Sequence, residues 1–527
     1  MKLCLENLEK FKSLCDEFPS YDVLKLREDS IKDPHWLAFG SGNIFRGYIA
    51  RINQDLINKG LSNRGISVVE SFDEEIIDKT YRPFDNLSLS ITLNKDGNFN
   101  TNLIANLVES LKVSEDYKRL EEIFTNENLQ IVSFTITEKG YSLFRPTGEI
   151  LDVVSEDIKK TDDYKHIMSV ACSLLYKRFK ANKAPITMLS LDNCSHNGDI
   201  LKNSISYIAN EWVKNDIVDR EFLDYINDEK FVTFPLSVID KITPRPSEKI
   251  EKFLMDKGFS DMDIVVTNKK SYVAPFINSE EAEYLVIENK FANGRDKLEE
   301  AGVYIVDREV TDMFEKMKVT TCLNPLHTTL AIYGCLLGYE SIYEEMEDKD
   351  LVKLVKEVGY NEGLPVVVDP KILSPKDFID EVINVRFPNP FIPDTPQRIA
   401  TDTSQKIPIR FGETIKSYLN SNSHNVSELK YIPLVLAGWL RYLMGVNDEG
   451  EEFELSSDPL LDELKVYFKN LSLGNVKDNN LVELLKNDRI FGVDLVEIGL
   501  SDVVLNYFYE LSAGKGAIRE TLKKYLR

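Results

Sequence analysis

The sequence is poor in the residues that build disulfide frameworks and metal clusters. Its 527 residues include six cysteines and five histidines, and no two cysteines have C-x-x-C spacing. We therefore expect free thiols and no metal site. Apolar runs of the roughly 20 residues needed to span a bilayer are missing too, and the N-terminal stretch lacks a signal-peptide core. These absences predict a cytoplasmic protein.

Positive charge is also in short supply. The chain carries 87 Asp and Glu against 64 Lys and Arg, a formal net charge of −23. This balance opposes a general attraction to phosphate backbones and anionic lipid, so we expect no nucleic-acid partner and no membrane partner. With 43% hydrophobic residues the chain has material for a large core, and its length favours two domains.

A glycine turn near the N-terminus indicates a dinucleotide site. The apolar run 35–39 leads into Gly-Ser-Gly-Asn-Ile-Phe-Arg-Gly, after which apolar residues recur at helical spacing. Strand, glycine turn and helix in this order let the backbone approach a pyrophosphate at the positive end of the helix. Phenylalanine replaces the usual third glycine, and a purely structural turn is an equal alternative. The candidate cofactor-binding residues are Gly40, Gly42, Asn43, Arg46 and Glu70.

Glu70 ends the next expected strand and bears on the choice of cofactor. An acid there accepts hydrogen bonds from the adenosine ribose, and the following Ser-Phe-Asp-Glu-Glu offers no arginine for a 2′-phosphate. NAD is therefore expected in preference to NADP. The interval from the glycines exceeds the typical ~20 residues, so the assignment of Glu70 as the ribose ligand stays open.

Other expected strands end in polar clusters. The apolar runs 131–136 and 186–191 lead into Thr-Glu-Lys-Gly-Tyr and Asp-Asn-Cys-Ser-His-Asn-Gly, which contains Asn193, and the run 231–239 leads into Asp240. Open α/β sheets bind ligands at the carboxyl ends of parallel strands, although ordinary turns explain such clusters as well. Beyond residue 291 helix-length amphipathic patterns replace strands. We expect a Rossmann-type α/β domain over 1–294 and a mostly α-helical domain over 295–527.

The stretch 318–327 gathers three polar groups in an apolar run. Lys318, Asn324 and His327 supply an amine, a carboxamide and an imidazole, the groups needed to take a proton from an alcohol. Asn324 followed by proline predicts a helix N-cap and first helical residue, with a buried helix over 328–339 behind it. Taken alone, a capped core helix with a neutral histidine explains the stretch better.

Seven motifs, taken in order, resemble the mannitol dehydrogenase family of long-chain polyol and hexuronate dehydrogenases. They are GSGNIFRG, TEKGY, DNCSHNG, FPLSVIDKITP, NGRDKLEEAG, KVTTCLNPLH and NPFIPDTPQRIATDTSQKIP, and they run from about Trp36 to Pro408. The resemblance implies metal-independent, NAD-linked hydride transfer between a secondary alcohol and a ketone of a linear sugar derivative. It also implies a cleft between a Rossmann domain and a mostly helical domain.

Family roles carried over motif by motif imply a catalytic lysine at Lys318 and carbonyl-polarising asparagines at Asn193 and Asn324. In alcohol oxidation the neutral amine would take the proton, and the carboxamides would stabilise the developing alkoxide. The implied substrate-binding residues are Asp240, His327, Arg398 and Lys406. A surface loop explains the segment that holds the last two equally well.

One departure from the family lies beside the expected base. Five residues separate Lys318 from Asn324, where the family usually has four. In a helix running through both, one extra residue would rotate the amine by ~100° away from the asparagine. We expect the extra residue to be absorbed before Asn324, in extended or bulged backbone, and Lys316 remains an alternative base.

The expected reaction is the NAD-linked reduction of D-fructuronate to D-mannonate, because Arg398 and Lys406 suit a carboxylate. The same positions serve neutral polyols in the wider family, so mannitol 2-dehydrogenase and tagaturonate reductase activities are alternatives. A non-catalytic nucleotide-sensing protein on the same fold is the alternative of another class. The expected partner is a small sugar acid or polyol, and the expected assembly is a monomer or small homo-oligomer.

Overall fold

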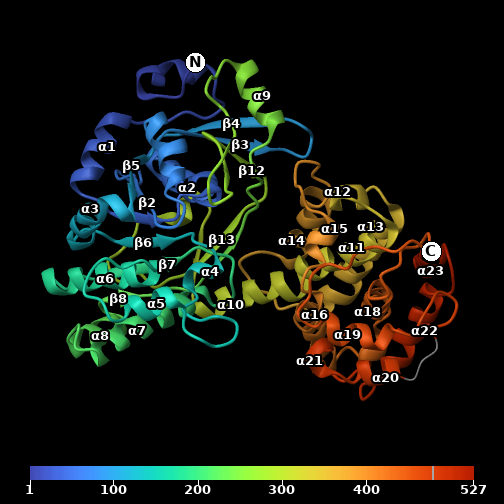
Figure 1. Ribbon diagram of the computed structural model, residues 1–527. Helices are drawn as coiled ribbons and strands as arrows, with labels where there is room; N and C mark the ends of the chain where they lie inside the picture. Colours follow the sequence, from blue (N-terminus) through green and yellow to red (C-terminus); the bar gives the residue numbers. More distant parts are fainter. Residues whose placement is uncertain (477–479) are drawn as a thin grey trace. The chain divides into compact units, whose positions relative to one another are not determined.

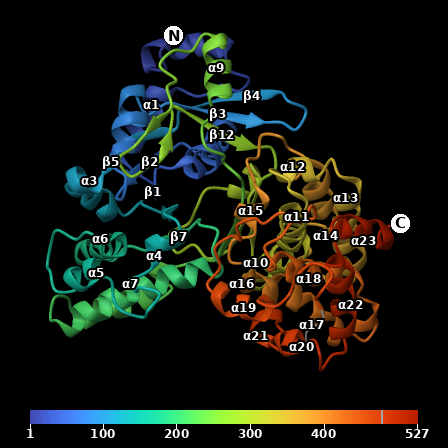
Figure 2. The ribbon, with the colours of Figure 1, turned by 45° about the vertical axis from the view of Figure 1, so that its right-hand side comes forward.

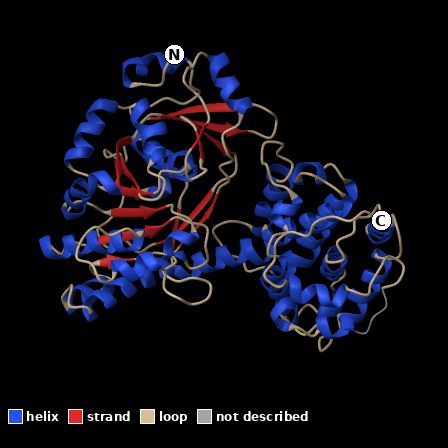
Figure 3. Cartoon of the chain, viewed as in Figure 1, coloured by secondary structure: helices blue, strands red, loops and turns tan. Residues whose placement is uncertain are grey.

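The computed structural model describes residues 1–476 and 480–527, which divide into unit 1, Met1–Thr311, and unit 2, Asp312–Arg527. The sequence predicts a boundary after residue 294, whereas unit 1 extends 17 residues further, to Thr311. The reason is that β14 (Tyr304–Val306) pairs in parallel with β13 (Tyr284–Glu288), which ties this segment to unit 1. Figure 3 shows the named strands in unit 1 and helices throughout the described part of unit 2.

A six-stranded sheet forms the frame of unit 1, and every pair of neighbours in it is parallel. Its strands are β1 (Trp36–Phe39), β2 (Ile66–Glu70), β5 (Leu107–Lys112), β6 (Ile131–Phe134), β7 (Ile186–Ser190) and β8 (Val232–Thr233). The order β5-β2-β1-β6-β7-β8 puts the first strand inside and winds the chain outward in both directions (Figure 1). This is the doubly wound Rossmann order that the sequence predicts.

Both faces of this sheet are buried. Successive strand residues point to opposite faces, so Leu37 and Phe39 of β1 belong to one apolar core while Trp36 and Ala38 belong to another. Residues of α3, α6 and α7 fill the first core and residues of η2 and α2 the second (Figures 1 and 2). The helices of unit 1 beside this sheet are α1 (Val23–Lys32), η2 (Phe45–Ile49), α2 (Ala50–Asn58), α3 (Val113–Thr125), α6 (Ile167–Ala181), α7 (Asn197–Lys214) and α8 (Arg220–Asn227).

Smaller elements complete unit 1. Further strands form the sheets β12-β3-β4 and β14-β13-β9 and the pair β10-β11. These strands are β3 (Ser88–Leu93), β4 (Phe99–Ile104), β9 (Ser237–Asp240), β10 (Val265–Val266), β11 (Tyr272–Val273) and β12 (Phe276–Glu280). The remaining helices are η1 (Leu5–Ser13), η3 (Ile77–Tyr81), η4 (Arg82–Phe84), α4 (Glu138–Tyr141), α5 (Asp152–Asp157), α9 (Glu248–Lys257) and η5 (Leu298–Ala301).

Unit 2 is built around α11 (Asn324–Leu337), which packs against α15, α18 and η6. The predicted buried helix over 328–339 is confirmed up to Leu337, because Leu330 and Tyr333 are fully buried, but it ends two residues early, at Gly338 with its left-handed backbone. The other helices from 308 onward are α10 (Arg308–Met317), η6 (Lys318–Cys322), α12 (Ile342–Glu345), α13 (Lys349–Lys356), η7 (Glu357–Gly363), η8 (Leu364–Val366), α14 (Pro375–Glu381), η9 (Val382–Arg386), α15 (Pro396–Ile399), α16 (Thr403–Ile407), η10 (Pro408–Gly412), α17 (Glu413–Leu419), η11 (Val426–Glu428), α18 (Tyr431–Tyr442), α19 (Leu461–Phe468), α20 (Asn480–Leu485), α21 (Asp488–Phe491), α22 (Ser501–Leu511) and α23 (Ala517–Tyr525). Within the described residues, every helix is too short or too polar to cross a membrane.

Candidate active site

The glycine turn of unit 1 leaves space for a ligand at the start of a helix. Gly40 follows β1 with φ +100°, and a side chain there would collide with the carbonyl oxygen of Thr135. At Gly42, by contrast, an added Cβ would meet nothing within 4 Å, and helical backbone begins at Asn43. The first glycine is thus required by the protein itself, and the second leaves room for a pyrophosphate to approach the helix N-terminus.

Arg46 supports this turn from inside unit 1. Its side chain is fully buried, donates from Nη1 to the carbonyl oxygen of Ala274 at 2.9 Å, and lies over the ring of Tyr81. The Tyr81 hydroxyl in turn donates to the carbonyl oxygen of Ser41 at 2.8 Å. The geometry gives Arg46 a positioning role, and its direct contact with a cofactor stays a prediction.

Glu70 joins the glycine turn to the loop that follows β2. Its Oε2 accepts hydrogen bonds from the backbone and hydroxyl of Ser41, at 2.9 and 2.6 Å, while Oε1 accepts from the backbone of Ser71 and Phe72, both at 3.0 Å. These donors occupy most of the acceptor sites of a carboxylate. Glu70 therefore orders the loop beside the turn, and its predicted contact with a ribose remains untested.

The polar clusters after β6 and β7 lie together, as expected for parallel neighbours. The carboxylate of Asp192 accepts hydrogen bonds from the backbone of Ile136 and Thr137 at 2.9 and 3.0 Å and from the Tyr141 hydroxyl at 2.6 Å. Burial raises the pKa of Asp192. The next residue, Asn193, is exposed at this edge of the sheet, so a rigid support positions the predicted carboxamide.

Asp240 ends β9, and its side chain is 6% exposed. The Asn197 carboxamide fixes this strand to the end of β7, because it donates to the carbonyl oxygen of Asp192 at 2.9 Å and accepts from the backbone of Ser237 at 3.0 Å. Asn193 and Asp240 thus belong to unit 1, whereas the other predicted catalytic and substrate-binding residues belong to unit 2. Their meeting in one cleft stays a prediction.

Lys318 opens a π-helical turn in unit 2. The turn η6 follows α10 directly, and the backbone of Leu323 donates to the carbonyl oxygen of Lys318, five residues back, at 3.1 Å. A π turn holds one residue more than an α turn. The extra residue before Asn324 is therefore taken up in a bulge, as predicted, but inside helical backbone and not in an extended segment. The predicted N-cap is wrong by one position, because Leu323 precedes the helix and Asn324 is its first residue.

The π turn places the two candidate lysines in different surroundings. Lys318 is 3% exposed, whereas Lys316 is exposed on α10. The Thr414 hydroxyl donates to the carbonyl oxygen of Thr320 at 2.9 Å, which satisfies one acceptor inside the turn. A buried amine at a fixed position suits a general base better than an exposed one.

His327 lies at the start of α11. Its Nε2 is 3.4 Å from Oδ2 of Asp394, outside hydrogen-bond geometry, and its ring packs against Phe387. Burial lowers the pKa of His327 to about 4; Asp394 opposes this shift, and the positive charges of Arg410 and Arg398 add to it. A neutral imidazole is suited to a hydrogen bond with a substrate hydroxyl.

The predicted cations Arg398 and Lys406 both lie in this part of unit 2. Arg398 forms an ion pair with Asp394, and its side chain is otherwise largely exposed. The Lys406 amine donates to the carbonyl oxygens of Ile399, at 3.1 Å, and Thr401. His327 and Arg398 therefore lie beside Asp394, and the charges of Arg398 and Arg410 act on Lys406, so these side chains form one cluster.

Charge repulsion is visible in this cluster. Burial, followed by the charge of Arg410, lowers the pKa of Lys406 to about 8, against the opposing effect of Asp402. A lysine in this state lies close to the point at which it would lose its proton. An anionic ligand would stabilise its charged form.

Arg410 was missed by the sequence analysis. It lies on η10, where Nη1 donates to the hydroxyl of Thr328 and points to the carbonyl oxygen of Asn324 at 3.5 Å. Burial lowers the pKa of Arg410 to about 10. Its place two residues after the last motif was the only signal in the sequence.

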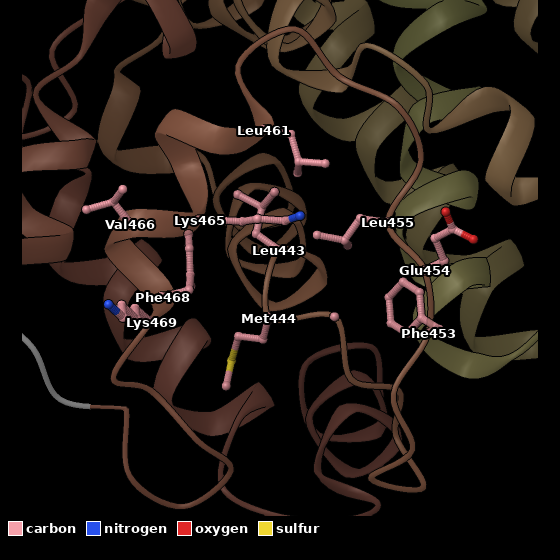
Figure 4. A pocket seen from close by; sticks show the side chains of 11 residues that line it. Leu443, Met444, Phe453, Glu454, Leu455, Leu461, Lys465, Val466, Phe468 and Lys469 are labelled. Atoms are coloured by element: carbon pink, nitrogen blue, oxygen red, sulfur yellow. The ribbon is translucent and has the colours of Figure 1, made fainter.

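A pocket of 640 Å³ elsewhere in unit 2 contains none of the predicted site residues (Figure 4). Mostly apolar side chains line it, among them Leu443, Leu455 and Leu461, with Lys465 beside them. It lacks the paired donors and proton carriers that a polyhydroxylated substrate requires. We do not assign the reaction to it.

Family comparison accounts for both units. The Mannitol dehydrogenase Rossmann domain matches residues 34–300, and the Mannitol dehydrogenase C-terminal domain matches residues 311–506. The chain belongs to the mannitol dehydrogenase family. The predicted resemblance and the predicted fold class are thus confirmed, and membership makes the chain a dehydrogenase that acts on CH–OH groups.

Individual relatives cover nearly all of the chain. D-mannonate oxidoreductase from Thermotoga maritima is 49% identical over 514 residues, which cover 96% of this chain and 95% of that protein. Polyol:NADP oxidoreductase from Gluconobacter oxydans is 29% identical and covers 84% and 86%. The substrate-free structure of D-sorbitol dehydrogenase has a TM-score of 0.82 at 25% identity, with full coverage of both chains. Mannitol 2-dehydrogenase from Pseudomonas fluorescens, in ternary complex with NAD and D-mannitol, has a TM-score of 0.72 at 24% identity, covers 100% and 99%, and supports the fold.

Proposed function

We propose that this mannitol dehydrogenase family member catalyses the NAD-linked interconversion of D-fructuronate and D-mannonate. The observation that carries the proposal is a local gathering of cations in a chain whose net charge is −23. Arg398 and Arg410 lie near His327, and their charges also act on Lys406. A sugar acid supplies the carboxylate that such a cluster stabilises. The 49% identity to a D-mannonate oxidoreductase supports the same substrate class.

In this proposal the residues divide the work. Lys318 removes the alcohol proton during oxidation and returns it during reduction. The carboxamides of Asn193 and Asn324 donate to the oxygen on which negative charge develops. The Asn324 carboxamide makes no hydrogen bond with the described residues. The glycine turn at Gly40 and Gly42 would hold NAD, which would supply the hydride acceptor. Neutral His327 and Asp240 hold substrate hydroxyls.

We propose NAD in preference to NADP. The turn at Gly40 and Gly42 fits a dinucleotide, and acidic side chains at Asp73 and Glu74 follow Glu70. They would repel a 2′-phosphate. One relative carries NADP in its name, so the choice is best measured by titrating the protein with NADH and NADPH and following nicotinamide fluorescence. Equal or tighter binding of NADPH would remove the assignment.

The decisive assay follows NADH oxidation with D-fructuronate, D-tagaturonate and D-fructose under one set of conditions. We expect the highest kcat/KM with D-fructuronate. A preference for D-fructose would make the protein a mannitol 2-dehydrogenase, and a preference for D-tagaturonate a tagaturonate reductase. Tight NADH binding without turnover of any of them would favour a nucleotide sensor.

We further infer that the protein acts in the cytoplasm as a monomer or small homo-oligomer. Cytoplasmic NADH and a soluble sugar acid are the partners that the proposed reaction needs. Light scattering of the purified chain would give the oligomeric state, and a state larger than a tetramer would contradict the inference.

A further inference from the structure

Arg410 is a half-buried guanidinium that lacks an acidic partner. Within residues 1–476 and 480–527, no Asp or Glu forms an ion pair with it. Burial lowers its pKa to about 10, which reflects the cost of keeping this charge away from water. Such a charge ordinarily has a counter-ion or binds one.

One edge of this guanidinium is left available. Nη1 is used by the Thr328 hydroxyl and the Asn324 carbonyl oxygen, whereas Nε and Nη2 make no hydrogen bond with the described residues. Nε and Nη2 form the edge that grips both oxygens of a carboxylate at once. The bonds to α11 therefore orient the side chain and leave its recognition edge unused.

The surroundings of Arg410 belong to the proposed site. Its contact with Asn324 ties it to the residue expected to polarise the substrate carbonyl, and its charge lowers the pKa of both His327 and Lys406. Asp394, the acid beside His327, is already paired with Arg398. The nearby acid therefore does not neutralise Arg410.

We propose that Arg410 binds the carboxylate of the substrate and is the residue that selects a sugar acid over the corresponding neutral polyol. The inference rests on the proposed function and names the group within that site that sets its substrate class. Lys406 and Arg398 add charge nearby, but one is bound to two carbonyl oxygens and the other to Asp394. Arg410 alone of the three presents an unengaged two-pronged edge within the described residues.

The test compares D-mannonate with D-mannitol, which has a CH₂OH group in place of the carboxylate. In the Arg410→Met variant, kcat/KM for D-mannonate should fall by about 30- to 1,000-fold, mainly through KM, because a buried charge contact is lost. The mannonate-to-mannitol ratio of kcat/KM should fall with it. Arg410→Lys should be intermediate, since it keeps the charge and loses the two-pronged contact.

The matched control is Arg489→Met on α21, which removes an exposed arginine of the same unit. NADH binding and the melting temperature report whether each variant folds; if Arg410→Met fails there, Arg410→Lys and Arg410→Gln decide. An equal loss with both substrates would show that Arg410 only positions α11 and would overturn the proposal, as would an unchanged KM for D-mannonate. Wild-type protein that turns over D-mannitol but not D-mannonate would instead refute the proposed function itself, and the role of Arg410 with it.

Discussion

Lys318 and Lys316 lie two residues apart in sequence, but only Lys318 is buried. We predict that Lys318→Ala lowers kcat by several orders of magnitude and leaves NADH affinity nearly unchanged, because the amine acts on the reacting oxygen. Asn193→Ala and Asn324→Ala should each cost about 10²–10³ in rate, since each removes one of two donors. Steady-state kinetics and NADH titration measure both effects.

Lys316→Ala is the matched control for Lys318→Ala. If it proved to be the inactive variant, the assignment of the base would be wrong by two residues; if neither lysine mattered, the mechanism would fail.

Glu345 is a fully buried carboxyl group whose two oxygens have no hydrogen-bond partner within the described residues. It ends α12 and lies directly against Gly334 of α11, where an added Cβ would collide with it and would also lie 2.9 Å from Pro396. Burial raises the pKa of Glu345 well above its usual value, and the neighbouring Asp348 and Glu344 add to the shift. Burial therefore favours the protonated form of this group in the folded protein.

This protonation predicts a specific pH dependence of stability. The unfolded chain releases the proton above a pKa of about 4.3 while the folded chain retains it, so the group lowers stability progressively as pH rises above that value. Glu345→Gln should therefore raise the melting temperature at pH 8, by about 2–4 °C per kcal/mol relieved, and leave it nearly unchanged at pH 4. The exposed Glu347→Gln is the control. A gain for Glu345→Gln that did not grow with pH would contradict the prediction.

At the scale of elements, the two glycines of the turn have different predicted roles: Gly40 is needed for folding and Gly42 for binding. Gly42→Ala should leave the melting temperature nearly unchanged but weaken NADH binding by about tenfold or more, ~1.4 kcal/mol, because the methyl group enters open space that the cofactor needs. Gly40→Ala should destabilise the protein by more than the ~1–2 kcal/mol of left-handed strain, since it also meets the Thr135 carbonyl. Gly60→Ala, with φ +70° and no neighbour within 4 Å, measures the strain alone. Wild-type NADH affinity in Gly42→Ala would remove the assignment of this turn.

Elements defined by local patterns could be predicted from the sequence, and those defined by distant contacts could not. Residues 40–47 are enough to predict the glycine turn. The strand order of the six-stranded sheet then follows from the Rossmann rule. The extra residue before Asn324 was visible, but its conversion into a π turn depends on partners such as Thr414, 94 residues from Thr320. Arg410 was missed for the same reason, because its meaning comes from the packing of η10 against η6 and α11.

The contacts that a motif's side chains make could not be read from the motif itself. Arg46 and Glu70, which the sequence predicts as cofactor-binding residues, make contacts inside unit 1 that hold the turn and the following loop, and their contact with a cofactor stays a prediction. A motif indicates that a charged side chain is needed at a position, but it does not say which atoms that side chain contacts. The three-dimensional structure decides whether the charge touches the ligand or the backbone that binds it.

At the scale of the whole molecule, strand pairing determines where the boundary between units 1 and 2 lies. The sequence pattern assigns residues 295–306 to the second domain, but β14 pairs with β13 and so belongs to unit 1. Strand pairing decides the assignment here and the local sequence pattern does not, because a strand left out of its sheet would have unsatisfied backbone hydrogen-bonding groups. A truncation meant to keep unit 1 intact must therefore retain β14 and end after Val306.

Chelation tests whether the whole protein carries out its reaction without a metal. In residues 1–476 and 480–527, no group of three or more His, Cys, Asp or Glu side chains is arranged to hold a metal ion. In the proposed mechanism, Lys318 and the two asparagines would supply the proton transfer and the charge stabilisation that a Lewis acid provides in other dehydrogenases. We predict that kcat with D-fructuronate and NADH stays within about twofold after incubation with EDTA and desalting, under conditions that inactivate a zinc-dependent dehydrogenase run in parallel. Loss of turnover that zinc or manganese restores would overturn the lysine mechanism.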